Sequence, residues 1–125
     1  MSRVLIALAA AAVAAPCLAQ DPSPLEAAFG NTIISTYPDG RTAELWLAPD
    51  GSYTAEGRRH EHTRGSWAIK DEQLCLKQGH PFAFGYVYCT PLRDEHVGST
   101  WQGKAVTGEP IRIKLVRGKI DPADG

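Results

Sequence analysis

The sequence has little of several features that mark specialised classes of protein. Its 125 residues include 3 cysteines and 1 methionine, and its 13 basic and 14 acidic side chains nearly cancel. No block of like charges occurs, which argues against a nucleic-acid partner and gives no reason to expect attraction to an anionic membrane. The sequence also has no HExxH, GxSxG or glycine-rich phosphate-loop motif. We therefore expect a small binding domain without a cofactor rather than an enzyme.

Long apolar runs are absent except for one at the N-terminus, from Val4 to Ala15. This run is shorter than the ~20 residues that an apolar helix needs to cross a bilayer. Arg3 precedes it and Pro16-Cys17-Leu18-Ala19 follows it, which is the order of a cleavable signal peptide. Lipidation of Cys17 is disfavoured because Pro16 stands where a small residue is required. We expect residues 1–19 to be removed and residues 20–125 to form one periplasmic or secreted domain with no integral membrane segment.

Signal cleavage would leave two cysteines, Cys75 and Cys89, in a compartment that permits disulfides. The count is even and no CxxC motif is present, which favours a structural bridge over redox or zinc chemistry. The two cysteines are equally far from Phe82 in the sequence, so a hairpin folded there would place them opposite each other. We predict a Cys75–Cys89 disulfide that stabilises the domain by roughly 3 kcal/mol.

Beyond a helical turn at Leu25 to Phe29, which Gly30 ends, the chain alternates short β-type segments with turns. Two near-identical turns, Pro38-Asp39-Gly40 and Pro49-Asp50-Gly51, favour antiparallel neighbours. The predicted strands are Asn31 to Tyr37, Thr42 to Ala48, Ser52 to Gly57, Arg64 to Lys70, Gln73 to Lys77, Tyr86 to Thr90, His96 to Trp101, and Ile111 to Arg117. We predict an all-β fold, a small eight-stranded antiparallel up-and-down barrel, because closure removes unpaired edges. A two-sheet β-sandwich is the alternative.

Alternation of apolar and polar residues assigns the strand faces. The clearest case is the last strand, where Ile111, Ile113 and Leu115 alternate with basic residues. The same pattern predicts further inward-facing sets: Ala43, Leu45 and Leu47; Trp67 and Ile69; Leu74 and Leu76; and Tyr86 and Tyr88. Cys75 and Cys89 then face outward.

Three segments make the chain similar to small bacterial periplasmic proteins with lipocalin-like, calycin-type barrels. They are the helical turn before Gly30-Asn31-Thr32, the triplet Gly65-Ser66-Trp67 and the segment Leu74-Cys75-Leu76. In lipocalins the Gly-x-Trp motif lies on the first strand, whereas here it falls on the fourth predicted strand. The resemblance implies the barrel and implies no ligand or residue role.

Two polar or aromatic segments are candidate sites. His60 and His62 lie on the same side of an extended segment, where they could share a Zn²⁺ or Cu²⁺ ion with Glu61, His80 or His96. The alternative is a solvated loop whose neighbouring arginines repel a cation. The second candidate is the loop Gln78 to Gly85, in which His80, Phe82 and Phe84 would bind a ligand or partner protein.

Aromatic side chains on the strands either fill the barrel or line a ligand-holding interior, since eight-stranded barrels are just wide enough for one small molecule. Filling is the more common arrangement. We expect an exported, non-enzymatic binding protein for a small ligand or a partner. The alternatives are an inhibitor of a secreted hydrolase, such as a protease or lysozyme, and an envelope metal-binding protein.

Overall fold

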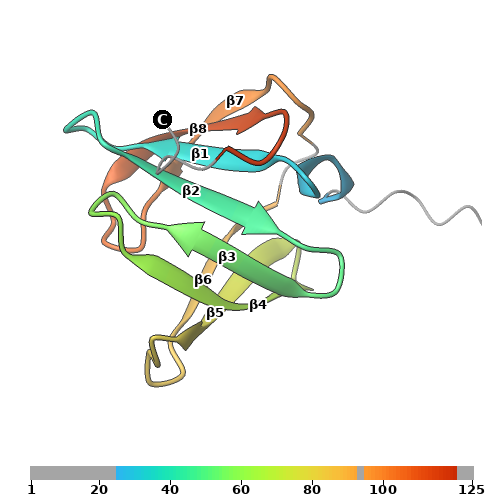
Figure 1. Cartoon of the computed structure of the whole chain (residues 1–125), viewed down its shortest axis with the longest axis vertical. Coiled ribbons are helices and arrows are strands. Elements are labelled where there is room, and N and C mark those ends of the chain that lie inside the picture. Colours follow the sequence, from blue (N-terminus) through green and yellow to red (C-terminus); the bar gives the residue numbers. More distant parts are fainter. Residues whose placement is uncertain (1–24, 93–94, 121–125) are drawn as a thin grey trace, which may run out of the picture.

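The computed structural model describes residues 25–92 and 95–120. These residues form one 3-10 turn and eight strands (Figure 1). The elements are η1 (Glu26–Ala28), β1 (Thr32–Thr36), β2 (Thr42–Leu47), β3 (Ser52–Glu56), β4 (His62–Lys70), β5 (Gln73–His80), β6 (Val87–Pro91), β7 (Thr100–Lys104) and β8 (Pro110–Val116). The predicted signal peptide lies outside the described residues. No described helix is long and apolar enough to cross a membrane.

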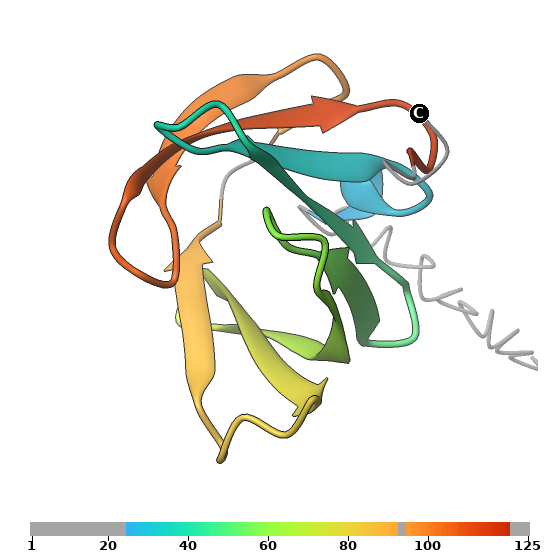
Figure 2. The same cartoon turned by 60° about the vertical axis from the view of Figure 1, so that its left-hand side comes forward.

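The eight strands belong to one antiparallel sheet in the order β6-β5-β4-β3-β2-β1-β8-β7. Strands that follow one another in the chain are therefore paired, except for β6 and β7. The first and last strands, β1 and β8, also pair, which curls the sheet into a nearly closed barrel (Figure 2). This confirms the up-and-down barrel and not the sandwich, which would need two sheets. The described strands β6 and β7 are the two edges of the sheet, and the Tyr88 hydroxyl on β6 donates a hydrogen bond to the Lys104 carbonyl on β7.

The short turns explain why consecutive strands become neighbours. Gly40 and Gly51 both have positive φ, which a glycine adopts without a steric penalty. Before them, the carboxylates of Asp39 and Asp50 accept hydrogen bonds from the backbone N–H groups two residues later, each at 2.9 Å. These two near-identical turns reverse the chain tightly enough for antiparallel pairing, as the sequence predicted.

The predicted faces hold for most strands. Ile111, Ile113 and Leu115 on β8 are buried in the interior, and Leu47 and Leu74 join the same core. Ile69 is an exception, because it is 42% exposed near the end of β4 instead of lying in the core. Trp67 is half-buried: its ring centroid lies 5.8 Å from that of Phe29, and its indole N–H donates to the Ala48 carbonyl at 2.7 Å.

Three predicted strands have boundaries that are wrong by more than one residue, and the strand predicted to end at Trp101 ends at Lys104. β4 begins at His62 because His62 and Thr63 pair with the end of β3. β5 continues to His80 because, past a bulge between Arg64 and Gly65, His80 still pairs with Arg64. The predicted strand from His96 to Trp101 instead begins at Thr100, since the segment before it forms a turn in which the Ser99 N–H donates to the His96 carbonyl at 2.9 Å.

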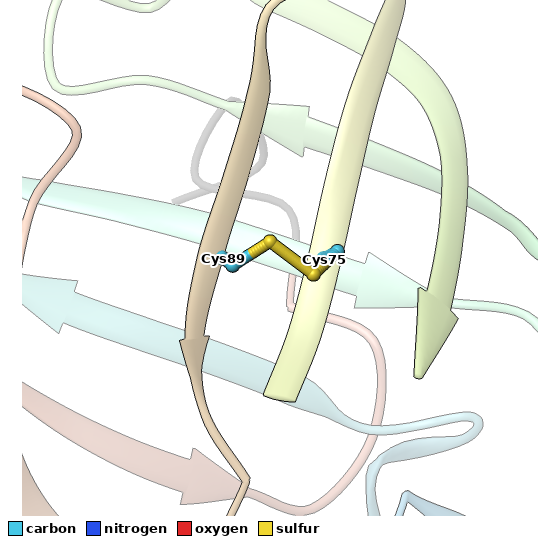
Figure 3. Close-up of a disulfide and its surroundings, with 2 residues drawn as sticks. All are labelled: Cys75 and Cys89. Atoms are coloured by element: carbon cyan, nitrogen blue, oxygen red, sulfur yellow. A yellow bond between two sulfur atoms is a disulfide. The ribbon is translucent and has the colours of Figure 1, made fainter. Parts of the chain in front are cut away.

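The predicted disulfide is present between Cys75 and Cys89 (Figure 3). The two residues are direct partners in the β5–β6 register, in the middle of the ladder. The bridge therefore ties one edge strand to the rest of the sheet. Cys75 is buried, although it was expected on an outward face.

Candidate functional site

The interior of the barrel is hollow and contains a cavity of about 350 Å³. Inward-facing residues from all eight strands line it, one example from each being Ile33, Leu45, Tyr53, Thr63, Leu74, Tyr88, Trp101 and Ile113. Most of the lining is apolar. The sequence left open whether the aromatic side chains fill the barrel or line a space inside it. In the structure, several of them line a space.

One end of the cavity is closed by the 3-10 turn. Leu25 and Ala28 are buried there against Leu47, Leu74 and Leu115, which come from the strand ends at that side of the barrel. The half-buried rings of Phe29 and Trp67 pack around this cluster. A ligand would therefore have to enter from elsewhere.

The opposite end of the barrel opens to solvent. Two residues that line the cavity there are well exposed: Tyr86 at 57% and Val106 at 60%. Tyr86 stands just before β6 and Val106 just after β7, beside the unpaired edges of the sheet. We call this end the mouth, formed by the turns 37–41, 57–61, 81–86 and 105–109.

Tyrosine hydroxyls are prominent among the polar groups of the cavity lining. Burial raises the pKa of Tyr53, of Tyr88 and of Tyr37. The phenols therefore stay protonated around neutral pH and can donate or accept a hydrogen bond. Such groups can orient a ligand with few polar atoms, and the lining also contains four carboxylates, those of Glu44, Glu56, Glu61 and Glu95.

Arg58 fastens three of the mouth turns together. Its guanidinium donates two hydrogen bonds to the Glu109 carboxylate, at 3.2 and 2.8 Å, and lies 3.7 Å from the Asp39 carboxylate. It also sits 4.3 Å above the ring centroid of Tyr37. Hydrogen bonds from Arg58 and then Thr107 lower the pKa of Glu109, while the bond to Glu109 raises the pKa of Arg58. No sequence pattern indicates this network, because Arg58 and Glu109 are 51 positions apart in the chain.

The two candidate metal-binding histidines converge on Glu56. The distance from Glu56 Oε1 is 3.5 Å to His60 Nδ1 and 3.6 Å to His62 Nε2. Glu56 is only 2% exposed, and its Oε2 atom has no hydrogen-bond partner among the described residues. Strand alternation gave no sign of this, because Glu56 ends β3 with the pattern of an outward-facing residue.

The other predicted ligands lie elsewhere. Glu61 Oε2 accepts a hydrogen bond from the Arg59 N–H at 3.0 Å, His80 pairs with Arg64 in the sheet register, and His96 Nδ1 lies 3.1 Å from Ser99 Oγ. Residues 25–92 and 95–120 contain no group of three or more metal-binding side chains that could hold one ion. Metal binding by His60 and His62 stays a prediction.

The predicted aromatic loop is shorter than expected, because Gln78, Gly79 and His80 belong to β5. The remaining turn, residues 81–86, projects beyond the barrel at the bottom of both cartoon views (Figures 1 and 2). Phe82 is 70% and Phe84 90% exposed, with ring centroids 5.2 Å apart. The rings therefore do not seal the mouth.

Comparisons with protein-family models, with curated proteins and with solved structures found no match to this chain. No activity can therefore be carried over from a relative.

Proposed function

We propose that this protein is an exported, non-enzymatic binding protein that holds a small, largely apolar ligand inside its barrel. The cavity is the observation that carries the proposal. Its volume of about 350 Å³ falls at the lower end of the range of roughly 300–1,000 Å³ that is typical of ligand pockets. Apolar walls with a few polar groups are also typical of such pockets.

The arrangement of the two ends supports binding from solution or from a surface. The closed end is packed with buried side chains, whereas Tyr86 and Val106 at the other end both line the cavity and face solvent. A ligand would enter at the mouth and place its apolar part against the aliphatic side chains. The protonated tyrosines would receive its polar atoms.

Export is supported by the disulfide, because such bonds persist in oxidising compartments. The leader-like N-terminus points in the same direction. A periplasmic or secreted location suits a carrier of small apolar molecules, which need a protein to keep them out of water.

The proposal predicts that the protein binds a neutral apolar dye, N-phenyl-1-naphthylamine, in its cavity. Replacing the cavity-lining Ala55 by Phe should fill part of the space and weaken dye binding by roughly tenfold or more. The matched control is Ala68→Phe, at an exposed position on β4 outside the cavity. Dye fluorescence titration measures the affinity, and thermal unfolding checks that each variant is folded.

Ala43→Leu, also on the cavity wall, is a smaller substitution for use if Ala55→Phe does not fold. A folded parent that binds no dye would contradict the proposal. Equal dye affinity in the parent, the cavity variants and Ala68→Phe would contradict it as well, since the dye would then bind outside the barrel.

A further inference from the structure

Exposed apolar side chains gather at the mouth of the barrel. Seven large apolar side chains are exposed among the described residues, and five of them lie here: Phe82, Phe84, Tyr86, Val87 and Val106. The first four occupy the turn 81–86 and the start of β6, and Val106 follows the neighbouring edge strand β7. We call these five residues the apolar tip. Soluble domains keep such patches small unless they contact something.

The apolar tip is held in place and is not a loose loop. Gln78 Nε2 donates to the Pro81 carbonyl at 2.7 Å, and the Tyr86 N–H donates to the Ala83 carbonyl at 3.0 Å. The disulfide in the middle of the β5–β6 ladder joins the two strands that carry the turn. A preordered surface loses less conformational entropy when it binds.

The β5–β6 hairpin that carries most of the apolar tip has basic side chains and no acidic ones. No acidic residue occurs between Glu72 and Asp94, whereas Lys77 and His80 lie on β5, with Arg64 opposite His80 on β4. Three acidic side chains lie in the other mouth turns: Arg58 engages Asp39 and Glu109, and Glu61 accepts a hydrogen bond from the Arg59 N–H at 3.0 Å. The β5–β6 hairpin is therefore locally basic, although the whole chain has a net charge of −1.

We propose that the apolar tip docks this protein on an anionic lipid surface. Aromatic and aliphatic side chains beside basic residues are the composition that binds at the membrane interface, where rings enter the headgroup region and cations meet anionic lipids. Protein interfaces instead centre on Trp, Tyr and Arg with paired hydrogen bonds. Phe82 and Phe84 offer no hydrogen-bonding group, and this favours lipid over a protein partner.

Docking in this way places the mouth of the cavity against the lipid. Ala83 and Tyr86 belong both to the turn 81–86 and to the cavity wall, so the inserted surface and the entrance are continuous. Transfer of an apolar molecule between bilayer and cavity rests on the proposed function. The docking itself does not.

Flotation with lipid vesicles tests the docking. We expect the mature chain to bind vesicles of mixed phosphatidylglycerol and phosphatidylcholine at low salt. Phe82→Ser combined with Phe84→Ser should lower the partition coefficient by roughly tenfold or more, because two rings no longer leave water. The control is Ile69→Ser, an exposed apolar position on β4 away from the mouth, which should bind like the parent. Lys77→Glu or added salt should weaken binding to the anionic vesicles.

The two proposals can fail separately. Ala55→Phe should still float with vesicles, and the double Phe variant should still bind the dye. Docking is overturned if the parent stays unbound, or if the double variant binds as well as the parent. Binding that neither Lys77→Glu nor salt weakens overturns the choice of an anionic surface. The parent could also fail to bind vesicles but form a dimer that the double Phe variant does not form. That result would assign the apolar tip to a protein contact instead.

Discussion

Arg58 is the residue on which the shape of the mouth depends most. Its guanidinium joins the turn 57–61 to Glu109 and Asp39 on two other turns, and the paired side chains are only partly exposed. Its planar donors match a carboxylate in a way that a lysine ammonium cannot. One side chain therefore ties together three of the four mouth turns, 37–41, 57–61 and 105–109.

The Arg58–Glu109 pair should make stability depend on pH. The pKa of Glu109 is lowered in the folded state, so the pair stabilises the fold above the unfolded pKa of about 4.3, and this contribution is lost as pH falls through the folded pKa. Glu109→Gln should therefore destabilise the protein more at pH 7 than at pH 3. Urea unfolding of the parent and the variant at both pH values measures the difference. Glu26→Gln, at an exposed position on the other end of the barrel, is the control.

A destabilisation by Glu109→Gln that is the same at both pH values would contradict this assignment. It would mean that the carboxylate matters for packing and not for its charge.

At the scale of the strands, the bulge between Arg64 and Gly65 determines how far β4 and β5 pair. A Cβ atom at Gly65 would lie 2.0 Å from the Lys77 carbonyl oxygen, which is backbone and cannot move aside. Gly103 on β7 is different, because a Cβ there would meet the tip of the Ile113 side chain at 2.9 Å. A side chain should therefore be tolerated at Gly103 but not at Gly65, although both glycines lie in strands.

We predict that Gly65→Ala destabilises the barrel by about 3 kcal/mol or more, because the strands must separate. Gly103→Ala is the matched control and should cost about 1 kcal/mol or less, since Ile113 can change rotamer. Equilibrium unfolding in urea compares the two. Equal losses would mean that the close approach of β4 and β5 relaxes easily.

The disulfide is the second feature that stabilises the packing of the strands. It closes a loop with a sequence separation of 14, for which the chain-entropy model gives about 3 kcal/mol of stabilisation. Replacing both Cys75 and Cys89 by Ala should lower the free energy of unfolding by about that amount. The parent in reductant should approach the variant, and the variant should not respond to reductant. An unchanged stability would show that β6 is held without the bridge.

At the scale of the whole molecule, we predict that the exported protein begins at Gln20. Cleavage after Ala19 leaves small residues at both recognition positions and avoids Pro16 at the new terminus. The intact mass of protein recovered from the periplasm or medium of an expressing bacterium tests this. A mass that includes Cys17 or an attached lipid would contradict it.

Local sequence patterns were sufficient for much of the fold. Alternation identified the inward face of β8, and the symmetry of Cys75 and Cys89 about Phe82 identified the bridge. Boundaries failed where a local irregularity intervened, at the bulge beside Gly65 and at the turn before Thr100. For the site, the loop with Phe82 and Phe84 was recognisable because two apolar rings stand among turn residues. The Arg58–Glu109 network was not, because the two residues lie far apart in the sequence.

The sequence by itself determined where most of the strands lie, that they meander, which cysteines pair and which loop carries two apolar rings, since each of these depends on neighbours within one hairpin. Only the tertiary structure decided that the barrel is hollow, that its edges meet at β6 and β7, and that Glu56 is buried beside His60 and His62. These properties depend on how eight strands curl and close together. Whether side chains meet across the interior is set by the barrel radius and by register summed over all strands, and no local pattern encodes that sum.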